Sequence, residues 1–317
     1  MPKRVEVAAG VLMRGDGHYL LGQRAMDTVY AGYWEFPGGK VEAGESPAAA
    51  LCRELDEELG IRVTHLRPWL YREHRYEHAH VQLHFFEVVA WQGEIMPRVH
   101  ADLAWVAPGA PAPAPMLPAN GPILKALRLP RLMGITRAAE VGIDRQLQAL
   151  DGALAAGLRL VQVREPGLAA GERAGFAAEV VRRVHAAGGL VLINDDPALA
   201  LACAADGVHL PARHLAAIDT RPDLAWVGAS CHDRGELERA AALGLDYALL
   251  GPVAPTCSHP GAPTLGWAGF ASLAADLCLP VLALGGLGAA DMTAARDAGA
   301  HGLAGIRGVW GACDPSQ

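Results

Sequence analysis

The run GKVEAGESPAAALCRELDEELG occupies residues 39–60 of this 317-residue chain and decides how its first part folds. A glycine turn, Pro37-Gly38-Gly39, leads into it. A helix is expected to begin near Ser46-Pro47, because serine caps a helix start and proline fits the first helical position. Gly60 ends this helix, since glycine readily adopts the left-handed backbone found there. The run therefore predicts a glycine loop followed by a helix.

Three acidic residues share one face of the predicted helix. Glu54, Glu57 and Glu58 stand at positions i, i+3 and i+4, which a helix stacks on one side. Such close carboxylates repel one another unless a cation joins them, and oxygen ligands alone suit magnesium or manganese better than zinc. An ion of this kind neutralises phosphate charge and activates water for attack at phosphorus. The alternative is a solvated acidic face on which Arg53 and Glu57 form an ordinary ion pair.

The spacing of the run resembles the Nudix box at every fixed position of that motif. Gly39 is followed after five residues by Glu45, and after seven more by RELDEELGI at 53–61. The resemblance implies a Nudix hydrolase domain, an α/β/α sandwich with a mixed sheet. It implies that Mg²⁺, or else Mn²⁺, is held by the three carboxylates and the carbonyl of Gly38, while Arg53 and Glu45 support the loop. The catalytic residues expected in this domain are Glu54, Glu57, Glu58 and Arg53.

Two further stretches are similar to the MutT-like, 8-oxo-dGTP diphosphatase branch of that family. They are YWEFPGGK at 33–40, the entry to the box, and LPAN at 117–120, a closing loop. The resemblance implies that Asn120 reads the oxidised purine, because an amide offers a donor and an acceptor together. It also implies that Phe36 lines the base pocket and that Arg24 lies near the nucleotide. As an alternative, Asn120 caps the helix that follows it.

One position departs from that branch. A glutamate that the branch carries six residues before a tryptophan is Val99 here, counted back from Trp105. His100, Asp102 and Glu94 are the candidates to replace it, and the sequence leaves the choice open.

Four histidines, at positions 74, 78, 80 and 84, lie close together in this first part. In a strand, the last three would share a face. A zinc site is one interpretation. Polar lining beside a phosphate cleft is the favoured one, because no cysteine or carboxylate completes a tetrahedral set.

The chain divides into two predicted domains, 1–129 and 130–317. The proline-alanine segment 107–115 is expected as an extended loop inside the first domain, because 120–127 reads as its closing helix. Beyond Leu132, apolar runs alternate with helical stretches; these runs are 132–136, 158–163, 190–193, 206–210, 225–229, 246–250, 280–284 and 301–305. Eight successive βα units predict a closed TIM (β/α)8 barrel, with a doubly wound sheet as the alternative. Both halves are therefore of the α/β class.

Residues 131–312 resemble the thiamine phosphate synthase and TenI family. The stretches that carry this resemblance are VQVRE at 161–165, INDD at 193–196, ADGVHL at 205–210, GASCH at 228–232, GPV at 251–253, PGAP at 260–263 and LGGL at 284–287. The resemblance implies that Gln162, Arg164 and Asn194 bind a pyrimidine diphosphate. These residues fall at predicted strand ends, where such a barrel assembles its site.

Further site residues follow from the same resemblance. Asp195 and Asp206 would hold magnesium, and the amides of Gly285 and Gly286 would bind a phosphate. His232 is placed like the histidine of a thiazole tautomerase within the TenI group, and a near-neutral pKa suits proton shuttling. The alternative for this histidine is a purely structural role at a strand end.

The barrel also departs from the synthase pattern. Pro166 and His259 stand where that pattern has lysines, and Pro211-Ala212 stands where it has Gly-Gln. Each charged hydrogen bond that is lost beside a diphosphate costs about 1.5–3 kcal/mol. We therefore expect a TenI-like barrel without full synthase activity.

The composition of the chain limits which binding partners and which cellular compartment are expected. A net charge of −7 supplies no basic field for a polymeric nucleic acid, so small molecules are the expected partners. The two resemblances imply that these are a nucleotide and, in the barrel, a thiamine-pathway ligand. The six cysteines are scattered, as in a reducing compartment. The apolar run 279–290 is broken by three glycines and is too short to span a membrane. These features predict a soluble cytoplasmic protein, and they leave its oligomeric state open, an oligomer included.

Three functional hypotheses follow. The leading one is a Mg²⁺-dependent pyrophosphohydrolase that converts 8-oxo-dGTP to 8-oxo-dGMP and pyrophosphate, and so serves DNA repair and replication fidelity. The second is a Nudix hydrolase of thiamine-pathway diphosphates, coupled to a synthase-like or tautomerase-like barrel. In the third, the barrel is a non-catalytic binding or oligomerisation module.

Overall fold

The computed structural model describes residues 3–76, 79–256, 261 and 263–310. Apart from the short segment Asp276–Cys278, the chain divides into two compact units between Arg128 and Leu129. Of the sequence positions discussed above, His78, His259, Pro260 and Ala262 lie outside the described residues. None of the described helices is long and apolar enough to cross a membrane.

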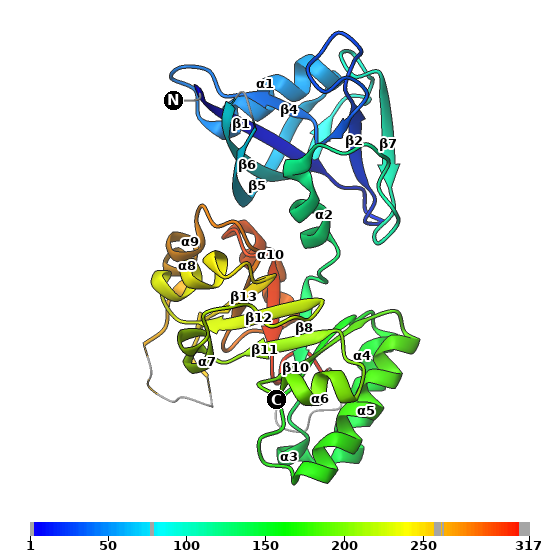
Figure 1. The fold of residues 1–317 in the computed structure, drawn as a ribbon, viewed down its shortest axis with the longest axis vertical. Helices are drawn as coiled ribbons and strands as arrows, with labels where there is room; N and C mark the ends of the chain where they lie inside the picture. Colours follow the sequence, from blue (N-terminus) through cyan, green and yellow to red (C-terminus); the bar gives the residue numbers. More distant parts are fainter. Residues whose placement is uncertain (1–2, 77–78, 257–260, 262, 311–317) are drawn as a thin grey trace. The chain divides into compact units, whose positions relative to one another are not determined.

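The first unit contains two β-sheets (Figure 1). A four-stranded sheet has the order β4-β1-β6-β5, in which β1 is parallel to β6 and antiparallel to β4. A three-stranded sheet has the order β3-β2-β7. The strands are β1 (Lys3–Leu12), β2 (Tyr19–Gln23), β3 (Trp34–Glu35), β4 (Gly38–Lys40), β5 (Arg62–Arg75), β6 (Ala79–Gln92) and β7 (Asp102–Val106). The mixed sheet implied by the sequence is confirmed.

Helices cover both faces of the sheet that contains β1. Successive side chains of a strand point to opposite faces, so β1 contributes to two cores. Ala8 and Leu12 pack with Leu51 and Leu55 of α1 (Pro47–Leu59), in one apolar cluster. Ala9 and Val11 lie in the other cluster, which includes the buried side of α2 (Gly121–Leu127). The α/β/α sandwich is confirmed.

The helix of residues 47–59 has the caps that the sequence predicts. The Ala49 N–H donates to Ser46 Oγ at 3.2 Å, and Pro47 occupies the first turn. Gly60 has φ 72° and its N–H donates to Asp56 O at 3.0 Å. The proline-alanine segment 107–115 contains neither helix nor strand, and it lies within the first unit before the short 3-10 helix η1 (Pro118–Asn120).

The second unit is a closed barrel of eight parallel strands in the order β10-β11-β12-β13-β14-β15-β8-β9. The strands are β8 (Leu132–Ile135), β9 (Leu160–Val163), β10 (Leu190–Asn194), β11 (Gly207–Leu210), β12 (Trp226–Cys231), β13 (Tyr247–Leu250), β14 (Val281–Leu284) and β15 (Gly302–Gly305). The helices are α3 (Ala138–Val141), α4 (Ile143–Ala155), α5 (Ala170–Ala186), α6 (Pro197–Ala202), α7 (Ala212–Ala217), α8 (Arg234–Ala242), α9 (Gly266–Ala274), η2 (Ala289–Asp291) and α10 (Met292–Asp297). Because β15 pairs with β8, the sheet closes and the doubly wound alternative is excluded.

Strand alternation sorts the barrel side chains into inner and outer sets. Leu160 and Leu192 belong to the inner cluster, while Val161 and Ile193 pack against the surrounding helices. Residues two positions along a strand point the same way. Polar residues later in the same strands therefore face inward, toward the end where this fold assembles a site.

Candidate functional site

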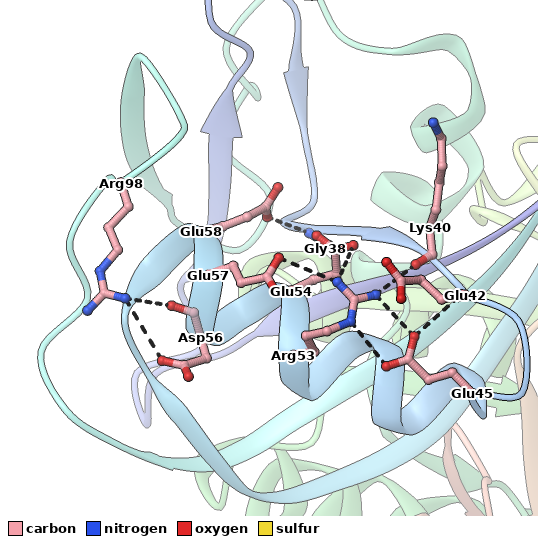
Figure 2. Close-up of polar contacts among 10 residues, drawn as sticks. All are labelled: Gly38, Lys40, Glu42, Glu45, Arg53, Glu54, Asp56, Glu57, Glu58 and Arg98. Carbon is pink, nitrogen blue, oxygen red and sulfur yellow. Dashed lines mark hydrogen bonds and ion pairs between the residues drawn. The ribbon is translucent and has the colours of Figure 1, made fainter.

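Two carboxylates of α1 lie against the glycine backbone of β4. The N–H of Gly38 donates to Glu58 Oε2 at 2.9 Å (Figure 2). At Gly39, a methyl group in the Cβ position would lie 2.2 Å from the carboxyl carbon of Glu54. Neither turn position leaves room for a side chain, so the glycines let these acidic groups approach the main chain.

Arg53 ties the loop before the helix to the carboxylate face. Its Nε donates to Glu45 Oε1 at 3.1 Å, and its Nη2 donates to Lys40 O at 3.0 Å. Its Nη1 reaches Glu54 Oε1 at 2.9 Å and Glu57 Oε2 at 3.4 Å (Figure 2). The Arg53–Glu57 ion pair expected on a solvated helix face is present, but Glu57 is only one of four residues that accept hydrogen bonds from Arg53. The arginine therefore does more than form a surface ion pair.

The electrostatics of Glu58 favour a proton or a cation beside it. Burial raises the pKa of Glu58 to about 8, and the nearby carboxylates of Glu35 and Glu54 add to the shift, while the Gly38 hydrogen bond opposes it. A carboxylate among negative neighbours is stabilised by a positive charge. The donor set is made of oxygens alone, which fits a hard divalent ion.

Glu57 differs from its two companions. Its side chain is 59% exposed and lies beside Arg53. In the part of the chain that the structure describes, no three acidic, histidine or cysteine side chains are arranged as a ready metal-binding group. The helix thus brings Glu54 and Glu58 to the glycine turn, while Glu57 is more exposed to solvent. The metal-binding roles of these three residues and of the Gly38 carbonyl stay predictions.

A second set of predicted residues surrounds Asn120. Asn120 is 3% exposed, and its Nδ2 contacts Met116 Sδ at 3.8 Å. It stands at the N-cap position of α2, where its side chain makes no capping hydrogen bond, so the capping alternative is not supported. Phe36 is buried between the rings of Tyr19 and Phe85. Phe36 is thus part of the core, and a contact with a base remains a prediction.

Arg24 is held by the half-buried carboxylate of Glu35. Its Nη1 lies 2.7 Å from both carboxylate oxygens of Glu35, and its Nε donates to Val29 O at 2.7 Å. Burial raises the pKa of Glu35, against the lowering effect of Arg24. The pair is positioned by the strand β3 that leads into the glycine turn. Sequence reasoning named Arg24 and missed Glu35, although Glu35 lies in the quoted stretch 33–40.

The structure distinguishes the three candidates to replace the loop glutamate. His100 is buried, and its Nε2 lies 3.9 Å from Glu35 Oε1. Burial, and secondarily Arg24, lowers the pKa of His100 to about 4, so its ring is neutral. Asp102 accepts a hydrogen bond from the neighbouring Leu103 N–H, and Glu94 is exposed. His100 is the candidate that faces the acidic cluster.

The histidines of β5 and β6 have local partners. His80 Nε2 lies 3.0 Å from Glu73, and His84 Nε2 lies 2.8 Å from Glu6. His74 packs against the ring of Tyr76, with centroids 4.4 Å apart. These contacts fit the interpretation of the histidines as polar lining residues. Among the described residues, no histidine belongs to a group of side chains that could hold a metal ion.

A polar row lies inside the barrel; it consists of Gln162, Asn194, His209, Ser230 and Tyr247. Gln162 Nε2 donates to Asn194 Oδ1 at 2.9 Å. His209 is 2.8 Å from both Tyr247 Oη and Ser230 Oγ. Burial, then the charge of Arg164, lowers the pKa of His209 to about 3, so its ring is neutral. Sequence reasoning missed His209 and Tyr247 as site members, because they lie on β11 and β13 and meet over the strand between them, β12.

Tyr247 reaches His209 because position 228 has no side chain. A Cβ at Gly228 would lie 2.0 Å from the Tyr247 ring. Gly228 is in register with both His209 and Tyr247. The small residue therefore makes space for the ring that completes the polar row.

One of the barrel predictions is wrong. Asp195 follows the carboxyl end of β10, but Asp206 precedes β11 and accepts a hydrogen bond from Val191 N–H near the start of β10. Asp206 also pairs with His185 at 2.8 Å. The two carboxylates lie at opposite ends of the barrel, so they cannot hold one ion together.

The remaining predicted barrel residues lie at the carboxyl ends of strands. Arg164 is exposed, and its N–H donates to Thr136 Oγ1 at 3.0 Å. His232 is 60% exposed, and both its N–H and its Nδ1 contact Glu236 Oε2. Gly285-Gly286 follows β14 with φ of 101° and 67°. Successive amides in such a conformation suit an anion, and this role stays a prediction.

Comparisons with known proteins match both halves of the chain to known families. A family model described as NUDIX domain matches residues 8–126, and one described as thiamine monophosphate synthase matches residues 132–309. The chain belongs to both families.

Three relatives illustrate this membership. A CTP pyrophosphohydrolase of Escherichia coli K12 is 39% identical over 124 residues, which cover 39% of this chain and 91% of that protein. An 8-oxo-dGTP diphosphatase of Proteus vulgaris is 40% identical over 93 residues, covering 29% of this chain and 83% of that protein. A thiamine-phosphate synthase of Chromobacterium violaceum is 38% identical over 196 residues, covering 58% and 92%. The first two match the Nudix domain and the third matches the barrel.

The two glycines of the Nudix turn should respond differently to a methyl group. Gly39→Ala forces the Glu54 carboxylate aside, so we expect a roughly 10–100-fold loss of metal affinity with less than about 1 kcal/mol loss of stability. Gly38→Ala meets the backbone oxygen of Ala8 at 2.2 Å and has φ 140°, so it should cost roughly 1–3 kcal/mol or more of stability. Metal titration and urea unfolding of both variants check this. Equal loss of stability in the two would contradict it.

Glu58 should make the metal-free Nudix domain less stable as the pH rises. Its folded pKa of about 8 exceeds the ordinary 4.5, so the folded state keeps a proton that the unfolded state releases between these pH values. Stability is therefore fully present below pH 4.5 and is lost toward pH 8, by an amount on the order of a few kcal/mol.

This pH dependence can be measured by urea unfolding in a chelator. Glu58→Gln, which resembles the protonated acid, should flatten the slope of stability against pH. Asp56→Asn is the matched control, because that carboxylate is 70% exposed on the same helix. A wild-type slope in Glu58→Gln would show that another group is responsible.

Proposed function

We propose that the Nudix domain is a Mg²⁺-dependent pyrophosphohydrolase that converts 8-oxo-dGTP to 8-oxo-dGMP and pyrophosphate. The observation that carries this proposal is the contact of Glu54 and Glu58 with the Gly38-Gly39 backbone. Membership of the family and the names of the relatives support a nucleoside triphosphate as the substrate class. Such an activity, exercised in the cytoplasm, would remove oxidised nucleotides before replication and so serve DNA repair.

The residues of this chain prepare the reaction in distinct ways. The bound divalent ion would supply charge neutralisation and an activated water. Arg53, anchored by Glu45 and by Lys40 O, keeps Glu54 and Glu57 in one patch. Carboxylates held in place before substrate arrives lose little entropy on binding.

Asn120 supports the choice of an oxidised purine. Its amide is buried and is not used to cap α2. A donor and an acceptor on one planar group match a base edge that presents both. CTP is the second candidate substrate, because the relative that matches the Nudix domain over 91% of its own length is named for it.

A substrate panel tests the proposal. The purified chain with Mg²⁺ is assayed against 8-oxo-dGTP, dGTP, CTP and hydroxymethylpyrimidine diphosphate. We expect the highest kcat/KM with 8-oxo-dGTP. Equal values for 8-oxo-dGTP and dGTP would remove the oxidised base from the proposal and leave the hydrolase, whereas preference for the pyrimidine diphosphate would favour a role in thiamine metabolism.

For the barrel, we propose binding of a small phosphorylated ligand of the thiamine pathway. The polar row and the Gly285-Gly286 turn support this choice. His232, held by Glu236, is the candidate proton carrier of a tautomerase reaction. If His232→Ala changes neither tautomerase activity nor growth without thiamine, the barrel is a binding or assembly module instead.

A further inference from the structure

Asp195 is contacted by the side chains of Arg213 and His214 of its own domain. It follows β10 in the left-handed backbone region, with φ 62°, and its side chain is 17% exposed. The guanidinium of Arg213 donates to Asp195 Oδ2. The Nδ1 of His214 contacts Asp195 Oδ1, without the alignment of a hydrogen bond. Both residues lie on α7, directly after β11.

The neighbours of Asp195 are also engaged. Asn194 Oδ1 accepts the Gln162 hydrogen bond described above. Asp196 accepts from Leu199 N–H at 2.9 Å as the cap of α6, and it pairs with Arg173 at 3.1 Å. Asn194, Asp195 and Asp196 at the end of β10 thus each have a protein partner. The second carboxylate that the family resemblance implied, Asp206, lies at the other end of the barrel.

A divalent ion does not fit this arrangement. Magnesium needs oxygen ligands in a near-octahedral set and usually takes one or two carboxylates together with substrate oxygens. Here one oxygen of the Asp195 carboxylate accepts from the Arg213 guanidinium and the other contacts the His214 ring, and an arginine keeps its charge at any working pH. A metal ion would have to displace the guanidinium while being repelled by it.

We propose that the barrel binds its ligand without a divalent cation, with Arg213 and His214 in the place beside Asp195 that the family resemblance gives to magnesium. A phosphate monoester is the ligand class that this favours. Its charge would be met by Arg164 and by the amides of Gly285-Gly286, and it needs no bridging ion. This inference concerns the barrel and is independent of the activity proposed for the Nudix domain.

The test is a titration of the full chain with Mn²⁺, with free Mn²⁺ followed by electron paramagnetic resonance. The comparison is between wild type and Asp195→Asn, since asparagine tolerates the left-handed backbone at this position. We expect the same number of bound ions, with affinities within about twofold. The titration is repeated with inorganic pyrophosphate, which supplies oxygen ligands of its own. Loss of one ion in Asp195→Asn under either condition overturns the proposal.

A gain of binding completes the test. Arg213→Asp removes the competing cation and adds a second carboxylate, so it should bind one more Mn²⁺ than wild type. Arg182→Asp, on the exposed side of α5, is the matched control and should bind no additional ion. If Arg213→Asp gains nothing, or if the control gains as much, Arg213 does not stand in the place of a metal. Circular dichroism confirms that each variant is folded.

Discussion

Glu57→Gln should lower kcat/KM for hydrolysis of the preferred nucleoside triphosphate by about 10³-fold or more, equivalent to ~4 kcal/mol of transition-state stabilisation. Glutamine keeps the size of the side chain and removes the charge that a divalent ion requires. Glu57 is 59% exposed, so stability should change by less than about 0.5 kcal/mol. A large kinetic effect at constant stability would identify a chemical role.

The matched control for this variant is its neighbour in the sequence. Asp56→Asn removes the same charge from the same helix, but Asp56 points away from the glycine turn and pairs with Arg98 (Figure 2). We expect kcat/KM within about twofold of wild type for this variant. If both substitutions reduce the rate equally, the effect is one of net helix charge, and the carboxylate face has no special role.

Asn120→Ala should lower the preference for 8-oxo-dGTP over dGTP by roughly 10–100-fold. A buried hydrogen-bonding group that loses its partner costs about 1–3 kcal/mol, and this cost falls on the nucleotide that uses the amide. The measurement is the ratio of kcat/KM for the two nucleotides in wild type and variant. Hydrolysis of dGTP should change little.

Asn120→Asp separates hydrogen bonding from shape. It keeps the outline of the side chain and replaces the amide donor with an acceptor, so it should lose the preference as Asn120→Ala does. If both variants lower the two kcat/KM values by the same factor, Asn120 supports the loop before α2 and does not read the base. Urea unfolding of each variant would then show a matching loss of stability.

Much of the Nudix domain could be predicted from the sequence because its signals are local. Ser46, Pro47 and Gly60 mark the ends of α1 within a single stretch of chain, and the structure confirms them. The spacing of Glu54, Glu57 and Glu58 places them on one face of that helix. Their unequal environments could not be predicted, because they depend on β4, which packs against the helix, and on the charge of Glu35 in β3, both from earlier in the chain.

The barrel shows the same division between local and distant signals. Its eight apolar runs correspond to the eight strands, because a strand buried on both faces is apolar throughout. The contact of His209 with Tyr247 joins residues 38 apart in the chain, and it also needs the gap at Gly228. No pattern within a short stretch of sequence predicts a contact of this kind.

The sequence already contained a signal that Asp206 could not share a magnesium ion with Asp195. A residue that precedes a strand lies at the amino end of a parallel barrel, while the site gathers at the carboxyl end. Asp206 begins the apolar run 206–210 and Asp195 comes after the run 190–193, so their placement in the sequence already put them at opposite ends. The pairing of Asp195 with Arg213 and His214, by contrast, depends on how α7 packs.

The measurement that bears most directly on the Nudix site is phosphorus NMR of 8-oxo-dGTP turnover by the full chain, with Mg²⁺ and with a chelator. The proposed function predicts 8-oxo-dGMP and pyrophosphate as products with Mg²⁺, and the metal role proposed for Glu54, Glu57 and Glu58 predicts no turnover in the chelator. Release of orthophosphate with a nucleoside diphosphate, or an unchanged rate without metal, would contradict the proposal that these three carboxylates hold a metal ion for pyrophosphate release.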